Sequence, residues 1–311
     1  MVGFNSTSFQ PATFQLAGFP GQEAAYHWIA VPFVVLYVTA MVGNCLVLCI
    51  VWADRRLHQP MYLFLCMLAV NDLGMALSTL PTVLGTFCFH FTDIAFNACL
   101  AQMFFIHSFS MVDSGILLAM AFDRLVAICN PLRYAAILTR PRIMRIGLAV
   151  VVRNFSVLFP FPFLIKRLPF CRSNALSHAY CLHPDVMKLA CADISVNVSY
   201  GLAVLLLTFV LDLLLIFISY VVIVMTIFNI ASGGERLKAL NTCISHICAV
   251  LIFYIPMMSV SVIHRYARHT PPLVHSLMSI FYLFIPPVLN PIIYSIKTKE
   301  IRKSILKMFS R

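Results

Sequence analysis

The chain has 311 residues, of which 61% are hydrophobic and only 11% charged, with a mean hydropathy of +0.92 and a formal net charge of +11. A water-soluble domain cannot bury so much apolar surface, which excludes that class and indicates that lipid solvates most of the chain. Inside a bilayer every backbone N–H and C=O must be paired within the protein, so only helices or a closed barrel remain.

The apolar stretches decide between these two architectures. Each is about 20 residues or longer, which suits helices that cross a ~30 Å hydrocarbon core rather than barrel strands of ~10 residues. They are, in chain order, Trp28–Trp52, Met61–Phe87, Ala98–Cys129, Ile143–Ile165, Val198–Phe228, Ala239–His264 and Pro272–Ile296. We therefore predict an all-α fold, a bundle of seven transmembrane helices. The first 27 residues show no basic segment followed by an apolar core, so we expect the first span to direct insertion.

The positions of Lys and Arg predict the orientation, because cytoplasmic segments carry an excess of both. With the N-terminus outside, the outer segments hold 6 of these residues and the inner segments 15, while Arg153 lies inside the fourth span. The inner set is Arg55, Arg56, Arg124, Arg133, Arg140, Arg142, Arg145, Arg236, Lys238, Lys297, Lys299, Arg302, Lys303, Lys307 and Arg311. The positive charge then faces anionic lipid, and we expect no nucleic-acid partner.

Cysteines and a glycosylation sequon agree with this sidedness. Five cysteines fall on the outer side, in the oxidising compartment: Cys88, which has no obvious partner, and Cys99, Cys171, Cys181 and Cys191. One of the last three can reach Cys99 while the other two close their loop, and spacing leaves the connectivity open. Asn5 begins an Asn-Ser-Thr sequon in the predicted outer tail and is our expected glycosylation site.

Four blocks resemble the olfactory receptor family of rhodopsin-like G-protein-coupled receptors. The third span ends in MAFDRLVAICNPLRY, residues 120–134, with Leu125 where that family usually has tyrosine. The other blocks are PMYLFL from Pro60, KALNTC from Lys238 and NPIIY from Asn290. LHQP at residues 57–60 and FYIP at 253–256 resemble the class I branch, whose members tend to detect carboxylic acids and other fairly polar odorants.

The resemblance implies a domain division and a pairing of the cysteines. Residues 1–27 are then an extracellular tail, 28–296 the seven-span receptor domain, and 297–311 a cytoplasmic amphipathic helix and tail. This last helix places apolar residues on one face and basic ones opposite, so we expect it to lie on the inner leaflet as a short eighth helix. Cys99 would pair with Cys181, and Cys171 with Cys191.

Ionisable residues inside the spans need an explanation, since each costs several kcal/mol in lipid. Asp123 and Arg124 end the third span, where an interfacial ion pair that anchors the helix is one interpretation. The resemblance implies a switch instead, in which Asp123 restrains Arg124 at rest. On activation Arg124 turns toward a cavity for the G protein, helped by Tyr220 and Tyr294.

A second polar group lies at mid-membrane depth on four helices: Asn44, Asp72, Asp113 and Asn290. Two carboxylates cannot both stay charged and unpaired in hydrocarbon. The group is either a structural hydrogen-bond cluster without an ion or, by resemblance, a pocket where sodium binds Asp72 and Asp113 and stabilises the inactive state. We expect no other metal or cofactor. Asp212 and Arg153 are interpreted as helix-packing partners without an assigned function.

The predicted ligand site lies in the outer half of the bundle. In the sixth span Tyr254, Met258, Ser261 and Arg265 share one helical face, and in the third span His107, Ser110, Met111 and Ser114 form a comparable stripe. Arg265 either snorkels to the headgroups or clamps a carboxylate through its planar guanidinium. The class I resemblance favours the clamp.

We expect further residues to form the walls and roof of this site. They are Phe104, Phe105, Phe159, Phe161 and Phe163 as an apolar wall, His183 as part of the roof, and Ser279 and Tyr282 from the seventh span. Ile106 stands where receptors for amines carry aspartate, so amine ligands are not expected to bind in that way.

The resulting hypothesis is an odorant receptor of the plasma membrane that binds a small volatile ligand and activates a stimulatory olfactory-type heterotrimeric G protein, which raises cyclic AMP. A non-olfactory rhodopsin-like receptor for a metabolite or lipid is the alternative. A secondary transporter is more remote, because the sequence shows no internal repeat. An enzyme is not expected, because no metal-ligand cluster, phosphate loop or nucleophile triad appears in the sequence.

Overall fold

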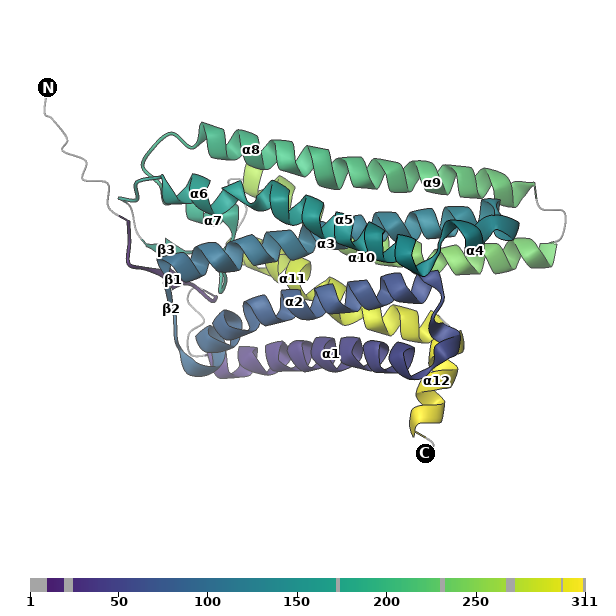
Figure 1. Cartoon of the computed structure of the whole chain (residues 1–311). Helices are drawn as coiled ribbons and strands as arrows, with labels where there is room; N and C mark the ends of the chain where they lie inside the picture. The colour runs from purple at the N-terminus through teal and green to yellow at the C-terminus, as the bar shows by residue number, and fades with distance from the viewer. Residues whose placement is uncertain are drawn as a thin grey trace, which may run out of the picture.

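A computed structural model of the chain describes residues 10–19, 25–171, 174–229, 233–266, 272–297 and 299–309. Long helices run alongside one another as a bundle, and α12 turns across one end of it (Figure 1). We call the end that carries α12 the inner end, and the opposite end, which carries both disulfides, the outer end.

Each of the seven apolar stretches forms one long helix or two consecutive ones. The bundle consists of α1 Tyr26–Ala53, α2 Pro60–Phe89, α3 Phe96–Cys129, α5 Arg140–Leu158, α6 Pro160–Lys166, α8 Ser195–Leu205, α9 Leu211–Phe228, α10 Gly233–Tyr266 and α11 Pro272–Lys297. The short helices are α4 Tyr134–Ile137, α7 His183–Met187 and α12 Lys299–Phe309. Most helices extend beyond the apolar stretch, because polar residues at a helix end stay helical outside the hydrocarbon.

Two of the predicted spans are interrupted. The fourth breaks between α5 and α6, where Pro160 lacks an N–H and its ring disfavours a continuous helix. The fifth contains a π-helical turn, Leu206–Val210, between α8 and α9. This turn contains no proline or glycine, and hydropathy did not predict it.

Six of the described helical segments are long and apolar enough to cross a membrane: Tyr26–Ala53, Pro60–Phe89, Arg140–Lys166, Ser195–Phe228, Ala239–Ile263 and Ser276–Ile296. Helix α3, which carries Asp113, Asp123 and Arg124, is not among them. All three side chains are buried, and α3 packs against α2, α5, α9 and α10. Its polar groups therefore face protein in the centre of the bundle.

A small sheet closes the outer end. Strand β1 Thr13–Leu16 pairs antiparallel with β2 Asp93–Ala95 and parallel with β3 Ala175–Leu176. Phe14 of β1 is fully buried, and its ring lies 5.6 Å from both Phe96 and Phe170. Strand β1 thus packs onto the loops at the outer end of the bundle.

Candidate functional site

A cavity of about 700 Å³ opens in the outer half of the bundle between α3, α7, α8, α10 and α11. Such a volume suits a small organic molecule. Most of its lining is apolar, and its polar lining residues are His107, His183, Lys188, Asn197, Ser261 and Tyr282. No described lining residue is acidic, and the polar side chains include the Lys188 cation and several groups that can donate hydrogen bonds.

The predicted ligand residues divide into two groups in the structure. His107, Met111 and Ser261 line the cavity. Arg265 falls in the last turn of α10, and its side chain lies outside the described residues. Met258 and Tyr254 do not line the cavity. Met257 lines it instead of Met258 because helical spacing places successive side chains about 100° apart.

The predicted aromatic wall is largely wrong. Of its five phenylalanines only Phe161 lines the cavity, and Phe159 and Phe163 are 62% and 59% exposed. The break before Pro160 turns these side chains outward. Phe104 and Phe105 pack against Phe155, at ring distances of 5.7 and 6.5 Å.

His183, assigned to the roof by sequence, does line the cavity. Its ring stacks on Phe161 with the centroids 4.4 Å apart. Its backbone N–H donates to Nε2 of His107 over 3.4 Å, a bond that requires the tautomer with Nε2 unprotonated. The loop and α3 are therefore joined directly above the ligand space.

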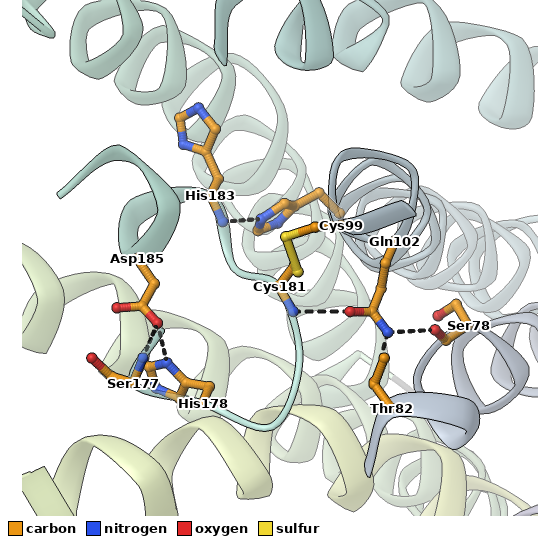
Figure 2. Close-up of a disulfide and its surroundings, with 10 residues drawn as sticks. Ser78, Thr82, Cys99, Gln102, Ser177, His178, Cys181, His183 and Asp185 are labelled. Carbon is orange, nitrogen blue, oxygen red and sulfur yellow. Dashed lines mark hydrogen bonds and ion pairs between the residues drawn. A yellow bond between two sulfur atoms is a disulfide. The ribbon is translucent and has the colours of Figure 1, made fainter. Parts of the chain in front are cut away.

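The loop is also fixed to α3 by a disulfide between Cys99 and Cys181 (Figure 2). Beside it, Gln102 accepts from the Cys181 N–H (2.9 Å) and donates to the Ser78 carbonyl (2.9 Å) and the Thr82 hydroxyl (2.8 Å). Through these three hydrogen bonds, the side-chain amide of Gln102 on α3 connects the loop to α2. Sequence reasoning missed Gln102, since one buried glutamine carries no motif.

A second disulfide joins Cys171 to Cys191 at the other end of this loop, with their Cα atoms 5.9 Å apart. Both pairs are those that the family resemblance implied. Asn5, the expected glycosylation site, lies outside the described residues.

His178 and Asp185 anchor the loop to α11. His178 Nδ1 lies 3.0 Å from Asp185 Oδ2 (Figure 2). Its Nε2 lies 3.0 Å from the Ser279 hydroxyl. This order of groups matches a catalytic triad, but Ser279 is fully buried and no substrate can reach it. The arrangement is a structural latch, and it explains why Ser279 does not line the cavity.

Asp185 stays ionised in this latch. Burial raises the pKa of its carboxyl, but the hydrogen bond and charge of His178, the Ser177 N–H and the charge of Lys188 together hold that pKa below its ordinary value. The Ser177 N–H donates to Oδ2 over 2.7 Å.

Below the cavity, Tyr254 joins a network that spans four helices. Its hydroxyl lies 2.7 Å from the Ser114 hydroxyl, which donates to Asp212 Oδ2 over 3.0 Å. Arg153 donates to both Asp212 oxygens, at 3.1 and 2.7 Å. The interpretation of Arg153 and Asp212 as packing partners is confirmed, and their connection to Tyr254 was not predicted.

The four mid-membrane polar residues are buried, and the hydrogen bonds found in the described part of the chain do not join all four into one network. Asn290 donates to Asp72 Oδ2 over 3.0 Å, and Asn71 donates to Asp113 Oδ1 over 2.6 Å. Asn44 instead bonds the carbonyls of Ala40 and Pro287, both at 2.9 Å, and so joins α1 to α11. The second oxygen of Asp72, Oδ1, is buried without a hydrogen-bond partner in the described part of the chain.

At the inner end, Asp123 binds Arg124 over 2.6 Å, as the sequence implied. Its other oxygen accepts from the Tyr134 hydroxyl over 2.7 Å, so α4 takes part in the restraint. Tyr134 ends the motif of residues 120–134, but the motif alone does not predict this contact, because the distance between Tyr134 and Asp123 depends on how the chain turns after α3.

In this conformation the hydroxyl groups of the two tyrosines assigned to the switch contact groups other than Arg124. Tyr220 hydrogen-bonds His246 Nδ1 over 2.8 Å, and His246 Nε2 bonds the Leu117 carbonyl over 3.0 Å. The Tyr294 hydroxyl faces Met120 Sδ at 3.9 Å. His246 thus holds α9, α10 and α3 together, and a lone histidine inside an apolar helix had given no sign of it.

Comparisons with known proteins agree with this architecture. A family profile described as olfactory receptor matches residues 33–311. Olfactory receptor 51I1 of Homo sapiens is 58% identical over 311 residues, covering 100% of this chain and 99% of the relative. Olfactory receptor 51E2 of Mus musculus is 52% identical over 305 residues, covering 98% and 95%.

Among solved structures, the crystal structure of squid rhodopsin has the same fold. It superposes with a TM-score of 0.75 at 18% identity, covering 97% of this chain and 91% of that chain. Fold, profile and full-length relatives agree on a multi-pass membrane protein that is not an enzyme, and they imply an odorant ligand and a G-protein partner. The chain belongs to the olfactory receptor family of G-protein-coupled receptors.

Proposed function

We propose that this receptor belongs to the class I branch and detects a small carboxylic acid or a similarly polar odorant. The observation that carries the proposal is the 700 Å³ cavity, whose described lining combines apolar walls with His107, Lys188, Asn197 and Ser261 and contains no acidic residue. An anionic headgroup finds donors there and no like charge. Arg265, near the outer end of α10, is our candidate for the carboxylate clamp.

A ligand in this cavity has a short physical path to the inner end. Met257 lines the cavity on α10, and Tyr254 lies nearly one turn further in and bonds Ser114. A shift of α10 would act on this bond and on the His246 contacts below it. We propose that this movement frees Arg124 to engage a stimulatory olfactory-type G protein, so that cyclic AMP rises.

A sodium ion at Asp72 and Asp113 is part of the proposal. Both carboxyl groups are buried, and Asp72 Oδ1 lacks a hydrogen bond among the described residues. A hard cation with oxygen ligands suits such a site, and it would stabilise the resting state. The alternative is a proton on one carboxyl and no ion.

The membrane topology completes the proposal. Helix α3 serves as the seventh span because its polar groups face the bundle, and α12 lies on the inner leaflet as the eighth helix. The N-terminus is extracellular, Asn5 is glycosylated, and the protein resides in the plasma membrane. The excess of Lys and Arg at the inner end supports this orientation.

The test is a cyclic AMP assay in cells that express the intact chain with an olfactory-type stimulatory G protein. Aliphatic acids of graded length are compared in the wild type, in Arg265→Ala and in Lys166→Ala. Lys166 is exposed and does not line the cavity, so its variant controls for the loss of an outer cation. We expect Arg265→Ala alone to lose the response at unchanged surface expression.

Equal responses in both variants would contradict the clamp. Silence of a wild-type receptor shown to be at the surface would contradict the acid ligand. A receptor for a metabolite or lipid would then be tested with neutral lipids and larger metabolites in the same assay.

A further inference from the structure

Helix α12 is held at the inner end of the bundle by a contact that no function described so far uses. Ile301 is fully buried and belongs to the main apolar core. One turn later, Ser304 donates its hydroxyl to Asp54 Oδ2 over 2.9 Å. Asp54 follows α1 directly, so this bond joins two parts of the chain that are 250 residues apart.

The Asp54 carboxylate is ionised, and its two oxygens accept three hydrogen bonds from Arg56 in addition to the one from Ser304. Its Oδ1 accepts from the backbone N–H and Nε of Arg56, at 3.1 and 3.0 Å, and its Oδ2 accepts from Arg56 Nη2 over 2.8 Å. The Arg56 hydrogen bonds hold the pKa of the Asp54 carboxyl far below its ordinary value. Ser304 therefore contributes the hydrogen that this carboxylate needs at its remaining position.

The surroundings of Ser304 fit an enzyme that recognises basic peptides. Arg302 and Lys303 precede it and are exposed, Ile305 follows, and Lys307 is exposed three residues later. Basophilic protein kinases bind such segments through acidic clefts by charge complementarity. Ser304 is half-buried, but α12 has only 11 residues, and so short a helix can open locally at little free energy.

We propose that Ser304 is a phosphorylation site for a basophilic protein kinase, and that the phosphate releases α12 from Asp54. The Ser304 oxygen forms a bond to the γ-phosphorus of ATP, the bond to ADP breaks, and the hydroxyl proton passes to the kinase. The product carries about −1.5 to −2 charges and has only acceptor oxygens. The bond to Asp54 is lost, and two anions then face each other.

Arg56 does not reverse this outcome. It already spans both oxygens of Asp54, and its side chain is 76% exposed, so water and salt screen any attraction to the phosphate. Asp54 cannot turn away either, because it also caps the backbone of Arg56. We therefore expect α12 to move after phosphorylation, while Asp54 and Arg56 stay in place.

The first test measures the modification. The intact receptor in lipid nanodiscs is incubated with ATP and the catalytic domain of protein kinase C, and the site is read by mass spectrometry. We expect phosphate on Ser304, none there in Ser304→Ala, and roughly tenfold slower incorporation in Arg302→Gln/Lys303→Gln. Absence of phosphate on Ser304 in the wild-type receptor would overturn the site.

The second test measures the release by hydrogen exchange of the α12 amides. Ser304→Glu stands in for complete phosphorylation, and Ser304→Gln is its neutral control of similar size. We expect exchange to rise roughly tenfold in the phosphorylated receptor and in Ser304→Glu, which corresponds to losing a charge-assisted hydrogen bond. Ser304→Gln should change it much less.

Asp54→Asn supplies the decisive comparison, because it keeps an acceptor for Ser304 and removes the charge. We expect phosphorylation to raise α12 exchange less in Asp54→Asn than in the wild type. An equal rise in both, or no rise in either, would overturn the release mechanism. Neither test uses an odorant or a G protein, so its result is independent of the proposed function.

Discussion

Arg153 and Asp212 show how single residues make an intramembrane charge acceptable. The Asp212 side chain is fully buried, while that of Arg153 is 38% exposed at the bundle surface. A buried carboxylate is tolerated only when it is paired and its remaining lone pairs accept hydrogen bonds. Arg153 supplies the paired charge and Ser114 supplies a further hydrogen bond to Asp212. Ser114 also links the ion pair to Tyr254.

This pair predicts a specific pattern of stabilities. Asp212→Leu leaves Arg153 without its carboxylate and should lower thermal stability in detergent strongly, by about 3–5 kcal/mol. Arg153→Leu/Asp212→Leu removes both charges and should unfold at a higher temperature than Asp212→Leu alone. Thermal unfolding of the three proteins checks the order, and additive effects of the two substitutions would contradict the pairing.

Tyr134 predicts a change in resting activity. Its hydroxyl is one of two groups that hold Asp123, and burial raises the pKa of this tyrosine, so it remains a donor at cellular pH. Tyr134→Phe removes a hydrogen bond of ~0.5–1.5 kcal/mol and should raise basal cyclic AMP about two- to tenfold. Basal signal is normalised to surface expression; an unchanged or lower signal would show that this bond does not restrain the switch.

At the scale of elements, the loop between α6 and α8 is a roof attached on two sides. Cys181 and Gln102 fix it to α3, and His178 and Tyr180 fix it to α11, where Tyr180 donates to the Ser279 carbonyl over 2.8 Å. Helix α7 follows these attached residues directly in the chain and lines the cavity. The position of the roof is thus determined by residues that the ligand does not touch.

The latch predicts a flat pH dependence. The folded pKa of Asp185 is lowered, so its stabilising contribution is complete above the unfolded value near ~3.9 and is lost only below it. Hydrogen exchange at the Ser177 amide, corrected for intrinsic rates, should keep the same protection from about pH 7.5 to about pH 5. Asp185→Asn should lose protection throughout, and a fall in the wild type within this window would contradict an ionised latch.

Helix α9 shows what hydropathy leaves out at this scale. The apolar run predicts one helix, but the π-helical turn at Leu206–Val210 changes the face on which Asp212 emerges. Asp212 consequently points into the bundle, where Arg153 and Ser114 meet it. The residue types in the turn do not predict this change, because the turn depends on packing against neighbouring helices.

At the scale of the whole molecule, the two disulfides close loops of very different length. Cys99 and Cys181 are 82 residues apart, and Cys171 and Cys191 are 20 apart. Loop-closure entropy makes the longer connection more stabilising by about 1 kcal/mol. Cys99→Ser/Cys181→Ser should therefore lower the unfolding temperature more than Cys171→Ser/Cys191→Ser. If Cys171→Ser/Cys191→Ser lowered the unfolding temperature more, the shorter disulfide would be the more stabilising of the two.

The sequence by itself determined the membrane-embedded helical class, the approximate limits of the spans and the resemblance to the family. These follow from length, hydropathy and contiguous motifs, which are local properties of the chain. The spacing of the cysteines left their connectivity open, and only the family resemblance implied the pairs. The Asp123–Arg124 pair was also predictable, because its members are adjacent.

Only the tertiary structure decided which distant side chains meet. Gln102 with Cys181, His178 with Ser279, Tyr134 with Asp123 and Ser304 with Asp54 each depend on rotations of whole helices or on the course of a loop. One residue of difference turns a helical side chain by about 100°, enough to exchange Met258 for Met257 at the cavity. Hydropathy and motifs do not encode that rotation, because it results from packing of all the helices together.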